Sequence, residues 1–254
     1  MLLVIDVGNT NTVLGLFAQE RLVHDWRLRT DKKITEDELG VLISSLFTAA
    51  GVSGKAVSKV VIASVVPPVD RIYEIFCRKH LFLSPRWIDA ATVPGIRVSY
   101  ANPAEIGADR VVNAVAAYHR YRCGLIVIDF GTAITFDLIS PEGEYRGGLI
   151  APGLSISAEA LFQEAAKLPR VDLRTPPEQL VGSDTAASIK SGLIYGFAGL
   201  VDGLVHRLQA EQPALEKVIA TGGLAALIAG VCETIEAVEP NLTLEGLRII
   251  ADQL

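Results

Sequence analysis

The chain has 254 residues, half of them hydrophobic, and a formal net charge of −6, so it can hold one large domain or two medium ones with a sizeable core. The acidic balance and the lack of a basic run disfavour a nucleic-acid-binding protein. No apolar segment reaches the roughly 18 residues of a membrane helix, the first residues show no signal peptide, and three scattered cysteines suit a reducing compartment. We therefore expect a cytoplasmic protein that binds neither membranes nor nucleic acids.

The first predicted element is a β-hairpin in residues 2–17, which read LLVIDVGNTNTVLGLF. An aliphatic run leads into a small polar turn, and a second apolar run follows from Thr12 to Phe17. Such a turn presents backbone N–H groups in a concave arrangement that binds phosphate oxygens, and Gly8 lets a ligand approach the main chain closely. Asp6 would then hold a Mg²⁺ ion that bridges its carboxylate to the phosphates. The alternative is an ordinary hairpin turn in which Asp6 caps backbone amides.

Three elements are predicted next along the chain. Thr35 and Glu38 form a capping-box pattern before a helix whose apolar residues recur through Phe47. Residues 59–66, KVVIASVV, are typical of a fully buried strand, which two prolines then end. Residues 108–120 are predicted to form a helix with its apolar positions on one side.

Near the middle of the chain the opening pattern returns, because residues 126–139 read IVIDFGTAITFDLI. At an offset of 123 residues, Asp6 corresponds to Asp129, Gly8 to Gly131 and Thr12 to Thr135. A repeat in register, with matching flanks, predicts two related halves that each open with a β-hairpin. We place these halves at residues 1–118 and 119–254.

The second half adds a long helix and a glycine pair. Residues 186–209 are predicted to be one helix, and residues 218–220 a short strand that runs into Thr221-Gly222-Gly223. A Gly-Gly turn between a strand and a helix lets a base or ribose lie against bare backbone near a helix N-terminus, although such turns also serve packing. Because strands and helices alternate, the predicted fold class is α/β with mixed sheets.

Four glycines lie on one face of the predicted long helix, at Gly192, Gly196, Gly199 and Gly203. Each costs roughly 0.8–1 kcal/mol relative to alanine in a helix interior. Their spacing would let another helix approach closely. The partner is either a helix of the same subunit or a second copy of the chain at a dimer interface.

Taken together and in this order, the segments DVGNTNT, DFGTAITFD and ATGGLA resemble the phosphate-1, phosphate-2 and adenosine elements of the acetate and sugar kinase/Hsp70/actin superfamily. Within this superfamily, the chain is similar to type III pantothenate kinases. The segments that carry this similarity are Gly107-Ala108-Asp109-Arg110, GGLIAPG at residues 147–153, and Thr185 before Ser191-Gly192. The resemblance spans nearly the whole chain. It implies two duplicated ribonuclease H-like (actin-like ATPase) domains, each a mixed sheet flanked by helices.

The resemblance also implies an activity: ATP-dependent phosphorylation of pantothenate to 4′-phosphopantothenate, the first step of coenzyme A biosynthesis. It implies a homodimer that needs a divalent cation such as Mg²⁺ and a monovalent cation, K⁺ or NH₄⁺. The ATP and phosphate contacts that it implies are Asp6, Val7, Gly8, Asn9, Thr10, Asn11, Thr12, Val13, Gly131, Thr132, Gly222 and Gly223. The implied pantothenate contacts are Tyr100, Gly107, Ala108, Asp109, Arg110 and Thr185. Asp6 and Asp129 are equivalent in the repeat, so the division of Mg²⁺ to Asp6 and the monovalent cation to Asp129 comes from the resemblance alone.

Asp109 is the expected catalytic base of an in-line phosphoryl transfer, because a carboxylate within hydrogen-bond reach suits a primary alcohol acceptor. On the residues alone, an acid at a helix start followed by a surface arginine explains Asp109 and Arg110 equally well, and the resemblance favours the catalytic role. The family often has Asn before the threonine that corresponds to Thr185. This chain has Asp184 there, which we expect to point away from the substrate or to cap the following helix.

Two rival functions remain at this stage. One keeps the fold and changes the substrate, to a sugar or another small alcohol, or makes the protein a phosphatase. The other is a nucleotide-binding transcriptional accessory protein without turnover. The Gly107–Arg110 segment disfavours the first, and the acidic charge disfavours the second.

Overall fold

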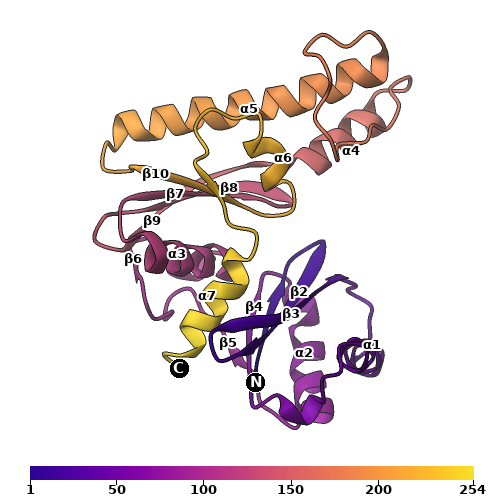
Figure 1. The fold of residues 1–254 in the computed structure, drawn as a ribbon, viewed down its shortest axis with the longest axis vertical. Helices are drawn as coiled ribbons and strands as arrows, with labels where there is room; N and C mark the ends of the chain where they lie inside the picture. The colour runs from indigo at the N-terminus through magenta and orange to yellow at the C-terminus, as the bar shows by residue number, and fades with distance from the viewer. The chain divides into compact units, whose positions relative to one another are not determined.

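The computed structural model describes residues 1–254 and divides the chain into two compact units (Figure 1). Unit 1 comprises Met1–His119 together with Leu242–Leu254, and unit 2 comprises Arg120–Asn241. The division into residues 1–118 and 119–254 follows the repeat in the sequence. The compact units differ from it chiefly in the C-terminal helix α7 (Leu242–Ala251), which groups with the N-terminal unit.

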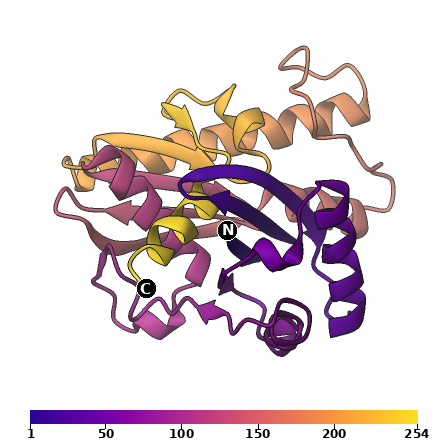
Figure 2. The same cartoon turned by 60° about the horizontal axis from the view of Figure 1, so that its bottom comes forward.

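Unit 1 is built on a mixed sheet with strand order β3-β2-β1-β4-β5. The strands are β1 (Leu2–Val7), β2 (Asn11–Ala18), β3 (Arg21–Arg29), β4 (Lys59–Ser64) and β5 (Arg86–Trp87). β1 pairs antiparallel with β2 and parallel with β4. The predicted first hairpin is therefore confirmed, and in Figure 2 it is the indigo ribbon near the N-terminus.

One face of this sheet carries the main core of unit 1. Alternate residues of β1, from Leu3 to Val7, pack with helices α1 (Glu36–Ala49) and α2 (Pro67–Phe76), as the two-residue period of a strand requires. The capping box at the start of α1 is present, since Thr35 and Glu38 bond each other's backbone N–H groups. Pro67 both follows β4 and occupies the first turn of α2, where its missing N–H is tolerated.

The opposite face of the sheet is covered by α7. A Cβ at Gly15 would lie 3.0 Å from a methyl of Val4 and 3.1 Å from a methyl of Leu244, so this helix is in direct contact with β1 and β2. α7 also packs tightly on α3 (Ala108–Tyr121): a Cβ at Gly246 would lie 2.3 Å from the carbonyl oxygen of Val112. Close packing on these two elements explains why the C-terminal helix belongs to unit 1. The remaining short elements of the unit are η1 (Gly54–Ala56), η2 (Cys77–Leu81), β6 (Arg97–Val98) and η3 (Pro103–Glu105).

Unit 2 repeats the arrangement, since the five strands that it contributes to its sheet have the order β11-β10-β7-β8-β9. The strands are β7 (Leu125–Phe130), β8 (Ala133–Ile139), β9 (Glu144–Pro152), β10 (Lys217–Thr221) and β11 (Ala237–Val238), and the helices are α4 (Leu154–Glu164), α5 (Thr185–Glu211) and α6 (Ala225–Ala229). The long helix α5 runs across the sheet (Figure 1), and its residues Ile194, Val201 and Val205 are fully buried in the core of the unit.

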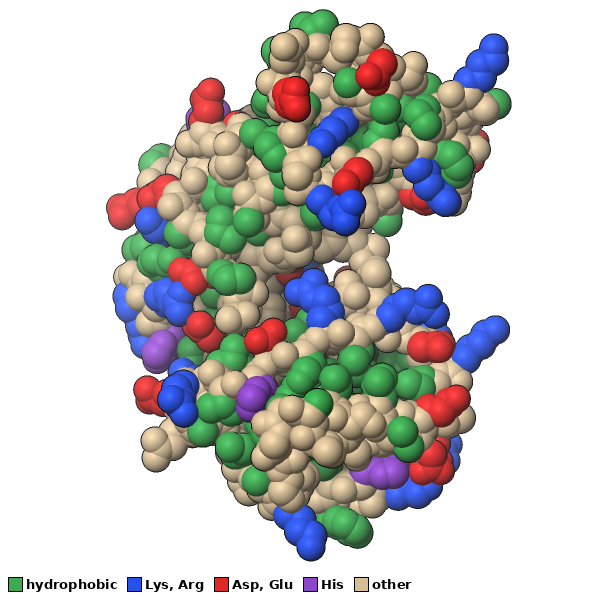
Figure 3. Space-filling model, turned by 45° about the vertical axis from the view of Figure 1, so that its right-hand side comes forward, with side chains coloured by type: hydrophobic (Ala, Val, Ile, Leu, Met, Phe, Trp, Pro, Cys, Tyr) green, Lys and Arg blue, Asp and Glu red, His purple; other side chains and the backbone are tan.

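The two units share one strand plan. β7 pairs antiparallel with β8 and parallel with β10, as β1 does with β2 and β4. This duplication of a mixed sheet flanked by helices confirms the predicted fold class. No helix among residues 1–254 combines the length and apolar character that a bilayer span requires. On the face drawn in Figure 3, basic and acidic side chains are interspersed.

Candidate functional site

The turn of the first hairpin is closed by its own backbone and shaped for a glycine. The N–H of Gly8 donates to the carbonyl of Asn11 at 3.1 Å, and a Cβ at Gly8 would lie 2.9 Å from that same oxygen. The N–H of Thr30, at the end of β3, donates to the carbonyl of Thr10 at 3.0 Å. Asn9 and Thr10 are exposed at the tip, so the turn offers its outer surface to a ligand.

The predicted contacts on this hairpin divide between the two faces of the sheet. Val7 and Thr12 are fully buried, and their side chains point into the protein. Only their main chain could meet a bound phosphate. Asp6 lies on the other face, paired with Val13 across the hairpin and with Ala63 of β4, and it is partly exposed. Asp6 is thus the carboxylate of this turn that solvent can reach.

Asp109 is the second residue of α3 and is held by local geometry. Its Oδ1 accepts a hydrogen bond from the N–H of Arg110 at 2.8 Å. A Cβ at Gly107 would lie 2.5 Å from the same oxygen, so a larger residue there would displace the carboxylate from this position. Arg110 itself is buried, with 8% of its surface exposed. The segment Gly107–Arg110 therefore fixes an acid and a base at the start of one helix.

The environment of Asp109 opposes its ionisation. Burial raises the pKa of the Asp109 carboxyl from its ordinary value of 3.8, against the backbone hydrogen bond and the positive charge of Arg110, which both lower it. A carboxylate whose pKa is raised toward neutrality is a better proton acceptor than a solvated one. Perturbed carboxyls of this kind are common at catalytic positions.

The turn of the first hairpin and the Asp109 segment meet at one edge of the unit 1 sheet. β1 and β4 are parallel and in register, and the N–H of Val65 donates to the carbonyl of Val7 at 3.0 Å. Val65 also lies against Gly107, where a Cβ would be 3.3 Å from its methyl. Asp6 and Asp109 therefore approach the same carboxyl edge of the parallel strands, the edge at which open α/β sheets bind ligands.

In unit 2 the second turn and the Gly-Gly turn are in contact. Asp129 of β7 pairs with Thr221 of β10, and Gly222 follows with φ +93°. A Cβ at Gly222 would lie 2.4 Å from Asp129 Oδ1, so the residue must be glycine both for its backbone angle and for space. The structure thus brings Asp129 and Gly222 together, while Gly223 is exposed beside them.

The tip of the second hairpin is supported by a residue to which the sequence analysis gave no role. Gly131 and Thr132 are exposed at the tip, and the N–H of Gly131 donates to the carbonyl of Ala133 at 3.0 Å. Gly153 packs beneath them: a Cβ there would lie 2.2 Å from the carbonyl oxygen of Thr132. The glycine at the end of the GGLIAPG segment is the signal that could have revealed this contact, since close backbone approach requires it.

Thr185 begins α5 and lines an open hollow with residues 182–184 and Ser188. Asp184 is the N-cap of this helix and accepts a hydrogen bond from the N–H of Ala187 at 2.8 Å, which confirms the expected capping role. Gly182 lies so close to the first turn that a Cβ would be 2.3 Å from the N atom of Ser188. Tyr100, another predicted contact, is 41% exposed in unit 1.

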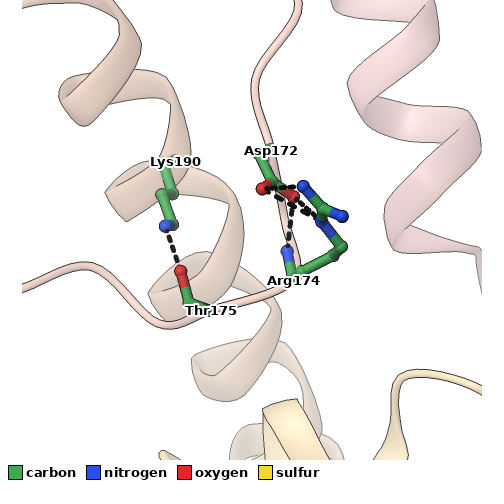
Figure 4. Close-up of polar contacts among 4 residues, drawn as sticks. All are labelled: Asp172, Arg174, Thr175 and Lys190. Atoms are coloured by element: carbon green, nitrogen blue, oxygen red, sulfur yellow. Dashed lines mark hydrogen bonds and ion pairs between the residues drawn. The ribbon is translucent and has the colours of Figure 1, made fainter.

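In the segment that precedes α5, one polar contact reaches the helix and another lies within the segment (Figure 4). Lys190 donates to the hydroxyl of Thr175 at 2.8 Å, and Arg174 forms an ion pair with Asp172 at 2.8 Å. The hydrogen bonds from Arg174 lower the pKa of Asp172 to about 2. Because this ion pair is exposed, it contributes little to stability.

Residues 1–254 contain no group of three or more His, Cys, Asp and Glu side chains that could enclose a metal ion. A single accessible carboxylate at the end of a strand, such as Asp6, nevertheless fits Mg²⁺, which is usually held by one or two carboxylates, substrate phosphates and water. The donor set therefore suits a metal that arrives with a nucleotide rather than a permanently caged ion.

Duplicated mixed sheets with a polar hairpin turn at the end of each first strand define the actin-like class of nucleotide-binding folds. Solved structures of this class match the whole chain. A ROK hexokinase from Thermus thermophilus is 16% identical with a TM-score of 0.52, covering 98% of this chain and 97% of its own. A conserved Campylobacter jejuni protein described as a Baf family transcriptional activator is 17% identical with a TM-score of 0.60, covering 99% and 98%. At such identities the likeness concerns the fold.

Sequence relatives define the family. The family model for type III pantothenate kinase matches residues 2–207. A type III pantothenate kinase of Desulfosudis oleivorans is 64% identical over 250 residues, which are 98% of each chain. One of Desulfatibacillum aliphaticivorans is 57% identical over 254 residues, 100% of this chain and 99% of its own. The chain belongs to the type III pantothenate kinase family.

Proposed function

We propose that this protein is a cytoplasmic kinase that uses ATP to phosphorylate pantothenate to 4′-phosphopantothenate, the first step of coenzyme A biosynthesis. Its membership of a kinase family and its full-length identity of 57% and 64% to relatives named pantothenate kinases support the reaction. The observation that carries the mechanism is the approach of Asp6 and Asp109 to one edge of the unit 1 sheet, with Asp109 poised as a proton acceptor.

The proposed reaction is an in-line transfer. The hydroxyl oxygen of pantothenate attacks the γ-phosphorus of ATP, the bond from that phosphorus to the bridging oxygen breaks, and ADP leaves with the electron pair. Asp109 accepts the proton of the hydroxyl as the new P–O bond forms. Asp6 would hold a divalent cation, which would supply positive charge to the phosphates. The turn residues Gly8 to Asn11 bind phosphate oxygens through backbone N–H groups and small side chains.

Pantothenate recognition is assigned here to the start of α3 and to two further hydroxyl side chains. We assign its carboxylate to Arg110 and to backbone N–H groups at the start of α3, since a guanidinium matches a carboxylate in shape and charge. Tyr100 and Thr185 supply further hydroxyl contacts in this proposal. It is supported by the position of Thr185 in an open hollow and by the exposure of the Tyr100 ring.

Residues of unit 2 are assigned to the nucleotide and to a monovalent cation by their local geometry. We assign a monovalent cation, K⁺ or NH₄⁺, to Asp129, phosphate contacts to Gly131 and Thr132, and adenosine to Gly222 and Gly223. The contact between Asp129 and Gly222 supports this assignment, because it brings the proposed cation and nucleoside positions together within the unit.

We also propose that the active form is a homodimer. A Cβ at Gly192, Gly196, Gly199 or Gly203 would meet no atom within 4 Å, apart from neighbouring residues of α5 itself. Packing of these glycines against another element of the same chain is therefore not observed. A second copy of the chain is the proposed partner for this face of α5, which lies in the same unit as the exposed side chains of Leu180 and Val181.

Purified protein with ATP, Mg²⁺ and K⁺, supplied with pantothenate or with a panel of sugars and small alcohols, tests the function. We expect ADP release that depends on pantothenate. Release of ADP with another alcohol but not with pantothenate would show that the protein is a kinase of the same fold with a different substrate. ATP binding without release under any condition would instead favour the nucleotide-binding accessory protein.

A further inference from the structure

Three hydroxyl groups, those of Tyr73, Thr12 and Thr30, form a hydrogen-bonded chain that ends on the turn of the first hairpin. We call this chain the hydroxyl file. The hydroxyl of Tyr73, on α2, donates to Thr12 Oγ1 at 3.1 Å. Thr12 Oγ1 lies 2.9 Å from Thr30 Oγ1, and the Thr30 hydroxyl donates to the carbonyl oxygen of Gly8 at 2.6 Å. Three elements of unit 1 thus contribute side chains that end on one carbonyl of the turn.

The direction of every proton in this file is fixed. A hydroxyl has one hydrogen to donate, and that of Thr30 is used on the carbonyl of Gly8, which can only accept. Thr30 must therefore accept from Thr12, and Thr12 must accept from Tyr73. Each donor polarises the next one, which strengthens the bonds of such a chain in a medium of low dielectric constant.

The surroundings of the file keep it intact. Thr12 is fully buried and Tyr73 is 4% exposed, so water does not compete for their hydroxyls. Burial also raises the pKa of Tyr73, which keeps its proton in place at neutral pH. Tyr73 is held by the core cluster that includes Val69 and Phe76 of the same helix.

The orientation of the Gly8 carbonyl, at the end of the file, determines the direction of the next N–H group in the turn. The peptide unit that joins Gly8 to Asn9 is planar and trans, so its C=O and N–H point in opposite directions. Because the carbonyl points inward to Thr30, the N–H of Asn9 points outward. Asn9 is exposed, and no acceptor within the chain bonds its N–H.

We infer that Tyr73, Thr12 and Thr30 are positioning residues that orient the Gly8–Asn9 peptide, so that the Asn9 N–H donates to a phosphate oxygen of the bound nucleotide. This inference rests on the proposed function, because it takes the turn to be the phosphate site. Removal of the Thr30 hydroxyl leaves the Gly8 carbonyl without its inward donor and lets the peptide rotate.

The test measures MgATP affinity by calorimetry and the kcat and KM for ATP in three variants and a control. Thr30→Val is expected to raise both the Kd and the KM for ATP about tenfold, the scale of one well-formed hydrogen bond. Thr30→Ser, which restores the hydroxyl, is expected to stay within about twofold of the wild type, and Tyr73→Phe to show an intermediate rise of about threefold. The control Thr48→Val removes a hydroxyl that bonds the carbonyl of Ser44 at 2.8 Å on α1, and should change neither constant.

An unchanged MgATP affinity in Thr30→Val, or an equal loss in Thr30→Ser, would overturn the inference. A fall in melting temperature alone, with Kd and KM unaltered, would also overturn it, since the residues would then serve stability only. If Thr30→Val does not fold, Tyr73→Phe and Thr30→Ser decide by the same criteria. If the wild-type protein binds MgATP but releases no pantothenate-dependent ADP, the proposed function is wrong, and the affinities of the variants still test the positioning role. If the wild-type protein does not bind MgATP, both the proposed function and the inference are wrong.

Discussion

At the scale of the residue, the surroundings of Asp109 disfavour the ionised form of its carboxyl. Its carboxyl is partly buried at the start of α3, and burial outweighs the lowering effects of Arg110 on its pKa. The sequence predicted the residue through its resemblance to a family motif. The raised pKa could not be predicted, because it depends on how Gly107 and the end of β4 pack around the carboxyl.

If Asp109 is the base, Asp109→Asn should lower kcat by roughly 10²–10⁴, the usual contribution of general base catalysis. The MgATP affinity should stay within about twofold, since the change leaves the phosphate turn intact. In the wild type, kcat/KM should fall on the acid side at a pH above the ordinary carboxyl value of 3.8. A variant with near-normal turnover would remove Asp109 from this role.

Asp109→Asn, which should lower kcat, should increase the stability of the fold at neutral pH. The pKa of Asp109 is raised in the folded protein, so its contribution to stability is complete below the unfolded value near 3.8 and is lost as pH rises through the folded value. Asp109→Asn is therefore expected to raise the melting temperature at neutral pH and to have no effect near pH 3. Thermal unfolding at both pH values measures this, and a lowered melting temperature at neutral pH would contradict it.

Among the elements, those with strong local signals were predicted well. The polar turns and alternating strands gave both hairpins, and the capping box gave α1. β9 (Glu144–Pro152) was not predicted, because its glycines and proline score against a strand. Its place depends on pairing with β8, where a Cβ at Gly148 would lie 1.6 Å from the carbonyl oxygen of Phe136. Such contacts are not encoded in any local pattern.

The hydroxyl file shows the same limit within the site. Thr12 was predicted as part of the phosphate turn, but nothing in the sequence links it to Thr30 or Tyr73, which lie 18 and 61 residues away. The sheet register and the packing of α2 bring the three together. The sequence thus predicted the turn itself, and its supporting hydroxyl groups became visible only in the structure.

The glycine face of α5 allows the proposed homodimer to be tested by a single substitution. Gly196→Leu should fit the isolated chain, since a Cβ there meets nothing within 4 Å beyond α5 itself, and should gain about 0.8 kcal/mol of helix propensity. In a dimer that packs on this face, the leucine would clash. We expect light scattering to show a dimeric wild type and a monomeric Gly196→Leu variant that keeps its helical circular dichroism.

The matched control is Ser44→Leu, which adds the same side chain on the exposed side of α1 and should leave the mass unchanged. A monomeric wild type, or a variant with the dimer mass and an unaltered melting temperature, would show that this face is not the interface.

At the scale of the whole molecule, the repeat seen in the sequence corresponds to two sheets with one strand plan. Each unit supplies a hairpin turn at the end of its first strand and a glycine-dependent contact beside it, Gly107 at Asp109 and Gly222 at Asp129. The compact units nevertheless differ from the sequence halves, because α7 of the second half groups with the N-terminal sheet. An amphipathic C-terminal helix carries no sequence signal for the sheet on which it packs.

The central claim is that this chain transfers the γ-phosphoryl group of ATP to pantothenate. The most direct measurement follows ADP by a coupled assay and 4′-phosphopantothenate by mass spectrometry in the same reaction with Mg²⁺ and K⁺. The account predicts equal amounts of the two products at every time point, and formation of both products slowed by roughly 10²–10⁴ with Asp109→Asn. ADP that accumulates at the same rate without pantothenate, or with no phosphorylated pantothenate beside it, would contradict the account.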